Sequence, residues 1–384
     1  MQSARAKGMT PAPHPVVSVI MANFRGAAHL EAAMRAVLDQ SESRLELILA
    51  DDASDDDSVA IARAVAKGDA RVRVIASARN QGPAAMRNLA LDAARGDWIA
   101  IVDSDDLIHP ERLARLVAAA EGAGADLVAD DLVHFGAPAE QGRTLLQSIG
   151  LAAPMWLGTP PYLRANGGDP ALPAFGYLKP VIRRAVLEGR RYDPRLRIGE
   201  DYNLVLRLLI DGARFLLLPD PLYAYRRHAG SISHRLSVGT VEAMLQAHRA
   251  LPPLADPEAR RAAAAVDRQL HRSLRYERLV ADIKARRWSR ALPRLGDPAM
   301  LSRLAQSLRD RRRRKAAQSQ GSPDPPLPAG PLPDLPPPGQ PWVSPPALAA
   351  ARIAAMAAKG EALPCGAPDW ALWLTRATGG TSAG

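Results

Sequence analysis

Three carboxylates, Asp103, Asp105 and Asp106, directly follow an apolar run at residues 98–102. The run predicts a strand that is buried on both faces, as in a parallel sheet. Because like charges this close repel one another, a cation is expected between them. A hard divalent metal prefers oxygen ligands, takes one or two carboxylates and completes its shell with phosphate and water. We therefore predict that Asp103 and Asp105 form an Asp-x-Asp metal site for a phosphate-bearing substrate.

A structural role is the alternative for the same residues. Ser104 and the aspartates would cap a helix that begins near His109–Glu111, since Asp and Ser are favourable caps and Pro suits a first turn. Capping accounts for one or two of these side chains but not for three carboxylates, so we favour the metal site.

The elements that must position these carboxylates follow an α/β pattern. Apolar runs that predict strands alternate with amphipathic helical patterns, the expected strands being residues 16–21, 45–50, 72–75, 98–102 and 126–129. This alternation implies right-handed crossovers and a mostly parallel sheet flanked by helices. Ligands of such sheets bind beyond the carboxyl ends of the strands. The turn after the first strand has neither the dinucleotide-binding glycine pattern nor a Walker pattern, which argues against a nicotinamide enzyme or a P-loop ATPase.

Composition and charge limit the class of protein. The 384 residues are 47% apolar, and their net charge of +10 comes from residues 251–315, which hold 18 Lys and Arg against 7 Asp and Glu. No apolar run approaches the ~20 residues of a membrane span. The single cysteine, Cys365, rules out an internal disulfide. Residues 1–13 are basic without the apolar centre of a signal peptide, so we expect a disordered leader on a cytoplasmic protein.

Five motifs occur together in an order that resembles a known family. They are residues 17–24, 47–56, 80–88 and 96–106, and the triplet Gly199-Glu200-Asp201. This arrangement is similar to that of family 2 glycosyltransferases, inverting enzymes of the GT-A (nucleotide-diphospho-sugar transferase) fold that include many bacterial exopolysaccharide transferases. The resemblance covers about residues 16–230, and it implies a GT-A domain at 14–238.

On the donor side, the resemblance implies nucleotide contacts from the end of the first strand, at Ala22, Asn23 and Phe24. It also implies that Asp52 hydrogen-bonds the base, usually uracil, and that Arg87 lies in the segment lining the diphosphate. The family commonly has Tyr at position 24 and a small hydroxyl residue or Pro at position 22, and this chain departs from both. From the residues alone, Asp52 is equally well explained as a turn or cap residue, and Arg87 as a surface charge.

For the chemistry, the resemblance implies that Asp103 faces the ribose or sugar, with Ser104 also at the donor, and that Asp105 ligates Mn²⁺ or Mg²⁺. Asp201 would be the general base. Sugar transfer with inversion needs one carboxylate to take the acceptor's proton, whereas a glycosidase needs a facing pair. The alternative is that Asp201 is favoured at a helix start by the macrodipole. Arg226 and His228 follow a further expected strand, where they would close on the diphosphate, with His228 completing the metal shell; a solvated basic loop is the alternative.

The middle and the C-terminal third carry less chemical information. Phe135 to Pro173 predicts irregular structure, with Trp156 and Tyr162 exposed, on the acceptor side of the fold. Residues 239–315 predict a basic helical extension, and peripheral attraction of its residues 251–315 to an anionic membrane is one hypothesis. Few aromatic residues interleave the basic ones, so no nucleic acid is expected. Residues 316–346 predict a Pro-rich linker, and 347–384 a short helical or irregular tail.

The resemblance, together with these residues, predicts a metal-assisted inverting glycosyltransferase. It would move a sugar from a nucleotide-diphosphate donor, a UDP-sugar in view of Asp52, to a glycan or lipid-linked acceptor. We place it in the cytoplasm, peripheral to the inner face of a bacterial inner membrane. A sugar-1-phosphate nucleotidyltransferase is the first alternative, but it requires a Gly-rich basic turn that residues 22–26 lack. The second is a non-catalytic nucleotide-sugar-binding module, against which the intact Asp103, Asp105 and Asp201 argue.

Overall fold

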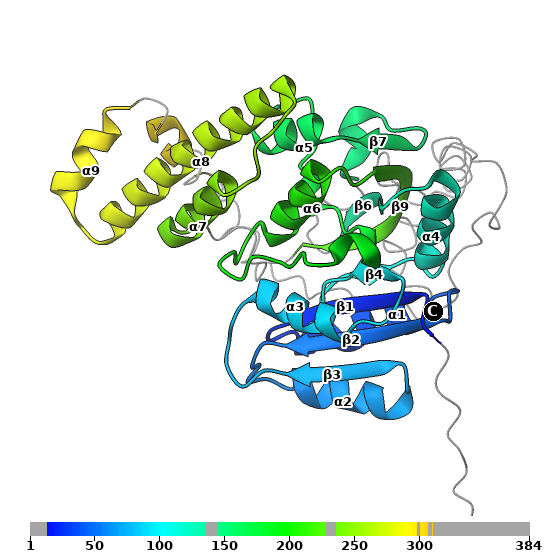
Figure 1. Ribbon diagram of the computed structural model, residues 1–384. Helices are drawn as coiled ribbons and strands as arrows, with labels where there is room; N and C mark the ends of the chain where they lie inside the picture. The colour runs from blue at the N-terminus through cyan, green and yellow to red at the C-terminus, as the bar shows by residue number, and fades with distance from the viewer. Residues whose placement is uncertain (1–13, 136–143, 228–235, 298–299, 306–308, 310–384) are drawn as a thin grey trace, which may run out of the picture.

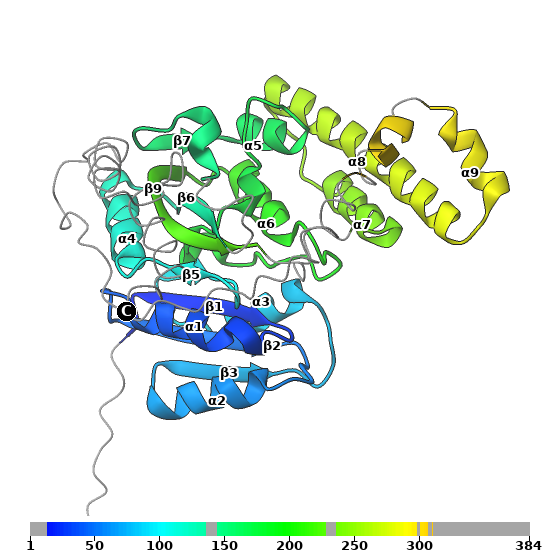
Figure 2. The same cartoon turned by 180° about the vertical axis from the view of Figure 1, so that it is seen from behind.

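The structure is a computed structural model, and it describes residues 14–135, 144–227, 236–297, 300–305 and 309. One nine-stranded sheet organises it, with helices on both faces and a helical extension at one side (Figure 1). The same extension is seen from behind in Figure 2, where α8 projects away from the sheet and α9 lies at its far end.

The N-terminal half is a parallel α/β unit in the strand order β3-β2-β1-β4. Its elements are, in chain order, β1 (Val17–Asn23), α1 (Ala27–Leu38), β2 (Leu45–Asp51), α2 (Ser58–Gly68), β3 (Val72–Ala76), α3 (Pro83–Ala93) and β4 (Trp98–Ile101). Successive residues of β1 enter opposite cores: Val19 packs with Leu30 of α1, and Ile20 packs with Met86 of α3. The strand is buried on both faces, as its unbroken apolar run predicts.

The second half makes the sheet mixed. Its strands are β5 (Leu107–Ile108), β6 (Leu127–Phe135), β7 (Met155–Leu157), β8 (Val181–Arg183) and β9 (Phe215–Arg226). Strand β8 lies between β4 and β6 and is antiparallel to both, whereas β6 and β9 are parallel. Its helices are α4 (Arg112–Ala123), α5 (Thr159–Asn166) and α6 (Glu200–Ile210), with short 3-10 turns at Leu146–Ile149, Phe175–Tyr177 and Arg184–Leu187.

Two expectations for the middle of the chain are wrong. The segment expected to be irregular contains β7 and α5. Tyr162 is 2% exposed, because its ring stacks between Phe175 and Tyr202 at centroid distances of 6.5 and 5.2 Å. Trp156 is 47% exposed, as expected.

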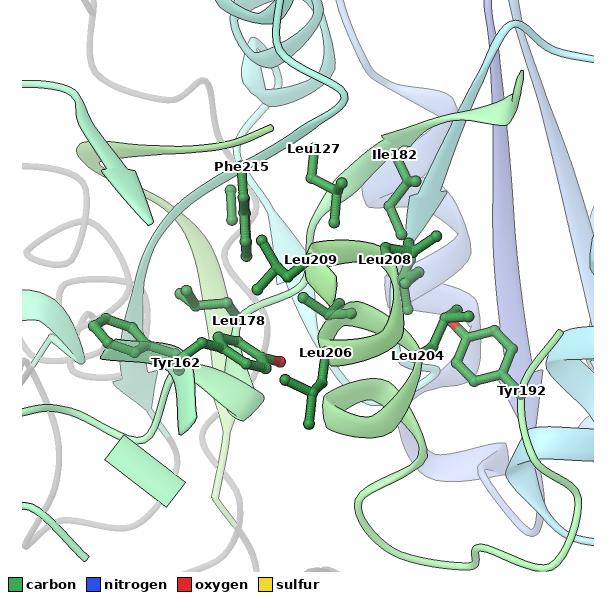
Figure 3. Close-up of a cluster of buried hydrophobic side chains, with 14 of the residues drawn as sticks. Leu127, Tyr162, Leu178, Ile182, Tyr192, Leu204, Leu206, Leu208, Leu209 and Phe215 are labelled. Carbon is green, nitrogen blue, oxygen red and sulfur yellow. The ribbon is translucent and has the colours of Figure 1, made fainter. Parts of the chain in front are cut away.

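Helix α6 is anchored by an apolar cluster that joins it to the sheet. Figure 3 shows Leu204, Leu206, Leu208 and Leu209 of α6 in a cluster that includes Leu127, Ile182 and Phe215 of three strands. All of these side chains are buried. Helix α6 therefore packs through these leucines on the part of the sheet formed by β6, β8 and β9.

The C-terminal helices are α7 (Val238–Arg249), α8 (Pro257–Lys284) and α9 (Trp288–Leu295). Buried residues of α7 and of α8 as far as Leu274 belong to the same apolar core as α5 and α6. Beyond Leu274, a separate small cluster joins the end of α8 to α9 through Tyr276, Leu279 and Ala291. No helix within the described ranges is both long enough and apolar enough to span a membrane.

Candidate active site

The carboxyl ends of the parallel strands carry the polar residues of the site. Asn23 at the end of β1 pairs in register with Asp51 of β2, and β4 runs parallel to β1 just before Asp103. Because parallel strands end at one edge, the expected residues Asn23, Asp52 and Asp103 lie along the same edge of the sheet. The predicted convergence of motifs distant in sequence is therefore present in the fold.

Asp52 is 3% exposed and orders the loop before α3. Its Oδ1 accepts the backbone N–H of Gln81 at 2.6 Å, and its Oδ2 accepts that of Gly82 at 2.8 Å. Gly82 has φ +93°, which a residue with a side chain rarely adopts. Asp52 therefore fixes the entry into α3, and a contact with a nucleotide base would use its remaining lone pairs.

The end of β1 presents one buried amide and one exposed ring. The Asn23 amide nitrogen donates to Asp51 Oδ2 at 2.7 Å, while Asn23 Oδ1 is buried and accepts no hydrogen bond from the residues that the structure describes. Phe24 is 40% exposed, with the Arg25 guanidinium 5.1 Å from its ring centroid. Ala22 is partly buried against the core. The expected nucleotide-contacting segment thus exposes an aromatic ring at this edge, while the amide oxygen of Asn23 is buried.

Arg87 is a buried cation of the site. It is 5% exposed, and it donates to Asp103 Oδ1 at 2.7 Å and, through a short hydrogen bond, to Glu200. Its Nη1 also lies 3.5 Å from Asp201 Oδ1. The surface-charge alternative for Arg87 is therefore wrong, because the first turns of α3 face the start of α6 at the carboxyl ends of the strands.

Lys179 is a second buried cation, and the sequence reasoning assigned it no role. Its Nζ lies 2.7 Å from Asp103 Oδ2 and 2.8 Å from Asp201 Oδ2. Burial lowers the pKa of Lys179, but Asp103 and Asp201 outweigh it and hold this pKa well above its ordinary value. The available signal was a lone lysine within the apolar run at 178–182, where an unpaired charge is costly.

These contacts define a buried ionic cluster of two cations and three carboxylates, Arg87, Lys179, Asp103, Glu200 and Asp201. Burial raises the pKa of Asp103, but Lys179 and Arg87 prevail and hold it well below the usual range. Burial raises the pKa of Glu200, against the attraction of Arg87. The cation expected beside Asp103 is thus supplied in part by the protein itself.

Asp106 organises the loop that carries Asp103 and Asp105. Its Oδ2 accepts the Tyr223 hydroxyl at 2.7 Å, and its Oδ1 accepts the Arg226 backbone N–H at 2.7 Å. Burial, with Asp105 and Asp103 nearby, raises the pKa of Asp106 well above its ordinary value. Arg226 Nε donates to the Asp105 carbonyl at 2.7 Å, so this expected donor-binding residue also braces the loop.

The helix-capping alternative for this loop is wrong. Strand β5 separates it from α4, whose N-cap is Glu111 with no side-chain cap hydrogen bond. Ser104 lies in the loop itself, where a Cβ added to Gly26 would come within 3.3 Å of its Oγ.

A hard divalent ion fits the donor set of this edge. Such an ion needs only one or two protein carboxylates when a diphosphate completes its shell. Asp105 could supply one, and Asp103, whose two oxygens already contact Arg87 and Lys179, could add a remaining lone pair. Within the described ranges, no group of three or more His, Cys, Asp or Glu side chains is arranged to hold a metal without such help. His228 lies outside the described residues. An ion at this edge would therefore be held jointly by Asp105, Asp103 and the donor.

Asp201 occupies the first turn of α6, directly after Gly199 with φ +81° and Glu200. It is 8% exposed, and its two oxygens differ in their surroundings. Oδ2 accepts from Lys179, whereas Oδ1 is buried and accepts no hydrogen bond from any described residue. A carboxylate oxygen that accepts no hydrogen bond retains lone pairs with which to receive a proton.

Comparison with known proteins identifies the class of enzyme that this fold and site define. Residues 18–188 match the family model described as "Glycosyl transferase family 2". The chain is 35% identical over 318 residues to the succinoglycan biosynthesis protein ExoO of Rhizobium meliloti (strain 1021), covering 79% of this chain and 88% of that protein. The chain belongs to glycosyltransferase family 2, as its motifs predict, and it is a glycosyltransferase of the polysaccharide-synthesising type.

Solved structures confirm the GT-A-type fold. TarS 1–349 of S. aureus in complex with UDP-GlcNAc matches with a TM-score of 0.54 and 20% identity, over 67% of this chain and 72% of that chain. The mannosyltransferase PcManGT of Pyrobaculum calidifontis, in complex with GDP-Man and Mn²⁺, matches with a TM-score of 0.50 and 18% identity, over 78% and 81%. At these identities the likeness concerns the fold alone.

Proposed function

We propose that this glycosyltransferase transfers a sugar, with inversion at the anomeric carbon, from a UDP-sugar to a growing glycan or a lipid-linked acceptor. The observation that carries the proposal is Asp201, a buried carboxylate beside Asp103. Its Oδ2 is held by Lys179, and its Oδ1, which lies 3.5 Å from Arg87 Nη1, accepts no hydrogen bond from the described residues. The glycosyltransferase family favours this reaction over nucleotidyl transfer and over a non-catalytic binding module.

In the proposed reaction, the acceptor hydroxyl oxygen attacks C1 of the donor sugar as its proton passes to Asp201 Oδ1. The bond between C1 and the diphosphate oxygen breaks, and UDP leaves with the electron pair on its β-phosphate. A Mn²⁺ or Mg²⁺ held by Asp105 and Asp103 would neutralise charge on the departing diphosphate. Phe24 and Asn23 at the end of β1 and Asp52 at the end of β2 hold the nucleotide, and Arg87 keeps Asp103 charged and in place.

Two neighbours of the same fold support the type of donor and the metal. The TarS complex contains UDP-GlcNAc, and the PcManGT complex contains GDP-Man with Mn²⁺. Because one neighbour binds a UDP-sugar and the other a GDP-sugar, the experiment compares donors of both kinds.

The test measures nucleoside diphosphate release from a panel of UDP- and GDP-sugars with Mn²⁺, for the wild type and for Asp201→Asn. We expect a UDP-sugar to be turned over by the wild type. Asp201→Asn should lose about 10²- to 10⁴-fold in turnover, the range that general base catalysis supplies, while calorimetry shows unchanged UDP binding. Full turnover by Asp201→Asn would show that Asp201 is not the general base.

We further propose that α9 brings the enzyme to an anionic membrane, on its cytoplasmic face, where a lipid-linked acceptor would lie. Trp288 and Leu292 are one turn apart on α9 and are 52% and 62% exposed. Arg286 and Arg290, close by in sequence, are also exposed. A basic amphipathic helix with Trp and Leu on one face binds the interface of a bilayer.

Co-sedimentation with vesicles containing an anionic phospholipid tests this surface. The double variant Trp288→Ser, Leu292→Ser should bind at least about tenfold more weakly than the wild type, since full burial of a single large apolar side chain is worth about 1.5–3 kcal/mol and about 1.4 kcal/mol is a tenfold change in affinity. Leu89→Ser removes an exposed leucine from α3 and serves as the matched control. Equal binding by all three proteins would contradict a role for α9.

A further inference from the structure

Lys179 contacts the proposed base in a way that distinguishes the two oxygens of Asp201. Its ammonium donates to Asp201 Oδ2 at 2.8 Å and lies 2.7 Å from Asp103 Oδ2. Arg87, the other cation nearby, lies 3.5 Å from Asp201 Oδ1 and makes no hydrogen bond to it. Of the described residues, then, Lys179 alone hydrogen-bonds the Asp201 side chain, and it does so at one oxygen only.

The fold fixes Lys179 from the backbone outward. It lies two residues before β8, whose Val181 pairs with Ala100 of β4 and Val128 of β6. Its own carbonyl accepts Nη2 of Arg112, a fully buried guanidinium that also pairs with Asp130. The lysine side chain therefore starts from a rigid point, and its ammonium has little freedom to follow a carboxylate that moves.

We propose that Lys179 is a positioning residue for the transfer reaction: by holding Asp201 Oδ2, it directs Oδ1 to the acceptor hydroxyl. This inference rests on the proposed function. The acceptor proton passes to Oδ1, the acceptor oxygen bonds to C1, and the C1–diphosphate bond breaks, while Lys179 keeps all of its own protons throughout. Lys179 touches neither the acceptor nor the donor sugar in this scheme, and it acts only through Asp201.

A purely structural role would be different. In that case Lys179 would only tie the end of β4 to the start of α6, and its loss would lower stability without any specific relation to Asp201. The two roles separate in a double-mutant cycle, because residues that act as a unit in catalysis lose activity together rather than additively.

The experiment compares Lys179→Met, Asp201→Asn and the double variant by steady-state UDP release. We expect Lys179→Met to lower kcat about 10- to 100-fold, as misplacing a reacting group does, with the donor KM and UDP affinity little changed. The double variant should be no slower than Asp201→Asn alone. Lys179→Arg, which retains the charge, should recover part of kcat.

The matched control is Arg95→Met, which takes the cation from buried Glu46 at the opposite edge of the sheet. It should lower the melting temperature without changing kcat. Unchanged kcat in Lys179→Met, or losses that add in the double variant, would overturn the inference. If Lys179→Met does not fold, the same cycle is run with Lys179→Gln, which removes the charge and keeps a polar side chain. Wild-type protein that turns over no nucleotide sugar would overturn the proposed function itself, a result that is distinct from both.

Discussion

The two edges of the parallel half of the sheet both carry a buried carboxylate with a cationic partner, and they differ in how completely the carboxylates are satisfied. At the amino edge, Glu46 Oε1 accepts from the Ser18 hydroxyl at 2.7 Å and from the Arg95 backbone N–H at 2.7 Å. Glu46 Oε2 accepts twice more, from Nε and Nη2 of Arg95. At the carboxyl edge, Asp201 leaves Oδ1 without a hydrogen-bond donor among the described residues.

The balance of charge differs in the same direction. The amino edge pairs one carboxylate with one guanidinium, whereas the ionic cluster at the carboxyl edge has three carboxylates for two cations. A fully satisfied ion pair stabilises the fold and offers nothing to a ligand. A buried cluster with an excess acid, one of whose oxygens accepts no hydrogen bond, is costly for folding, and that oxygen retains lone pairs for a proton. Both carboxylates are buried and charged. The candidate active site therefore differs from a structural ion pair in having a carboxylate oxygen that accepts no hydrogen bond.

Asp103→Asn should have the largest effect on activity at the carboxyl edge, because the Asp103 carboxylate contacts both buried cations, Arg87 and Lys179. We expect UDP release to fall about 10²- to 10³-fold, as for the loss of one preorganised electrostatic contact at a reacting centre. Initial rates at saturating donor and Mn²⁺ measure this, with circular dichroism as the check on folding. A variant that keeps more than half of the wild-type rate would show that the ionic cluster does not serve the chemistry.

Asp105→Asn should act on the metal rather than on the cluster. The variant should need roughly tenfold more Mn²⁺ for half-maximal activity, the lower end of the loss expected when an interaction that supports a metal is removed. Metal titration after treatment with a chelator gives this value, and Asp92→Asn, which removes an exposed acid of α3, provides the control. An unchanged Mn²⁺ requirement would show that Asp105 does not hold the metal.

Glu46→Gln tests the amino edge, where we expect a loss of stability without a loss of activity. It weakens the charge-assisted hydrogen bonds at the amino edge, so we expect a loss of about 1–3 kcal/mol in the free energy of unfolding. The kcat of the folded protein should stay the same, since Glu46 lies at the edge remote from Asp201. Urea denaturation and UDP release on the same preparation measure the two quantities. A large loss of kcat would show that the ion pair of Glu46 also serves the reaction, which would contradict a purely structural role for the amino edge.

The contribution of Glu46 should also depend on pH. Burial raises its pKa, but hydrogen bonds from Ser18 and Arg95 prevail and bring the pKa below its ordinary value of 4.5. A carboxyl whose pKa is depressed on folding stabilises the protein above its unfolded pKa, and this stabilisation is lost as the pH falls. The difference in melting temperature between wild type and Glu46→Gln should therefore be full at pH 7 and shrink below about pH 4.5. A difference that is constant from pH 7 to pH 3 would contradict this.

Much of the site could be predicted because its signals are local. The strand before Asp103 is an unbroken apolar run, and Asp201 directly precedes an amphipathic helical pattern, so both positions follow from short-range periodicity. The partners could not be predicted in the same way. Arg87 and Glu200 are 113 residues apart, and Lys179 and Asp201 are 22 apart with a turn and a strand between them. Nothing within a few residues of Lys179 specifies which carboxylates it will meet.

The alternation of strands and helices, the acids at the strand ends and the family of the enzyme could be inferred from the sequence alone. Each of these depends on short contiguous stretches of the chain. Only the tertiary structure decided that β8 enters the sheet antiparallel between β4 and β6, that Tyr162 is buried, and that Lys179 meets Asp103 and Asp201. The physical reason is that pairing and burial between distant segments depend on the packing of the whole core. Side-chain contacts of this kind are set by which faces of the sheet and of α6 are covered, and no local pattern records that choice.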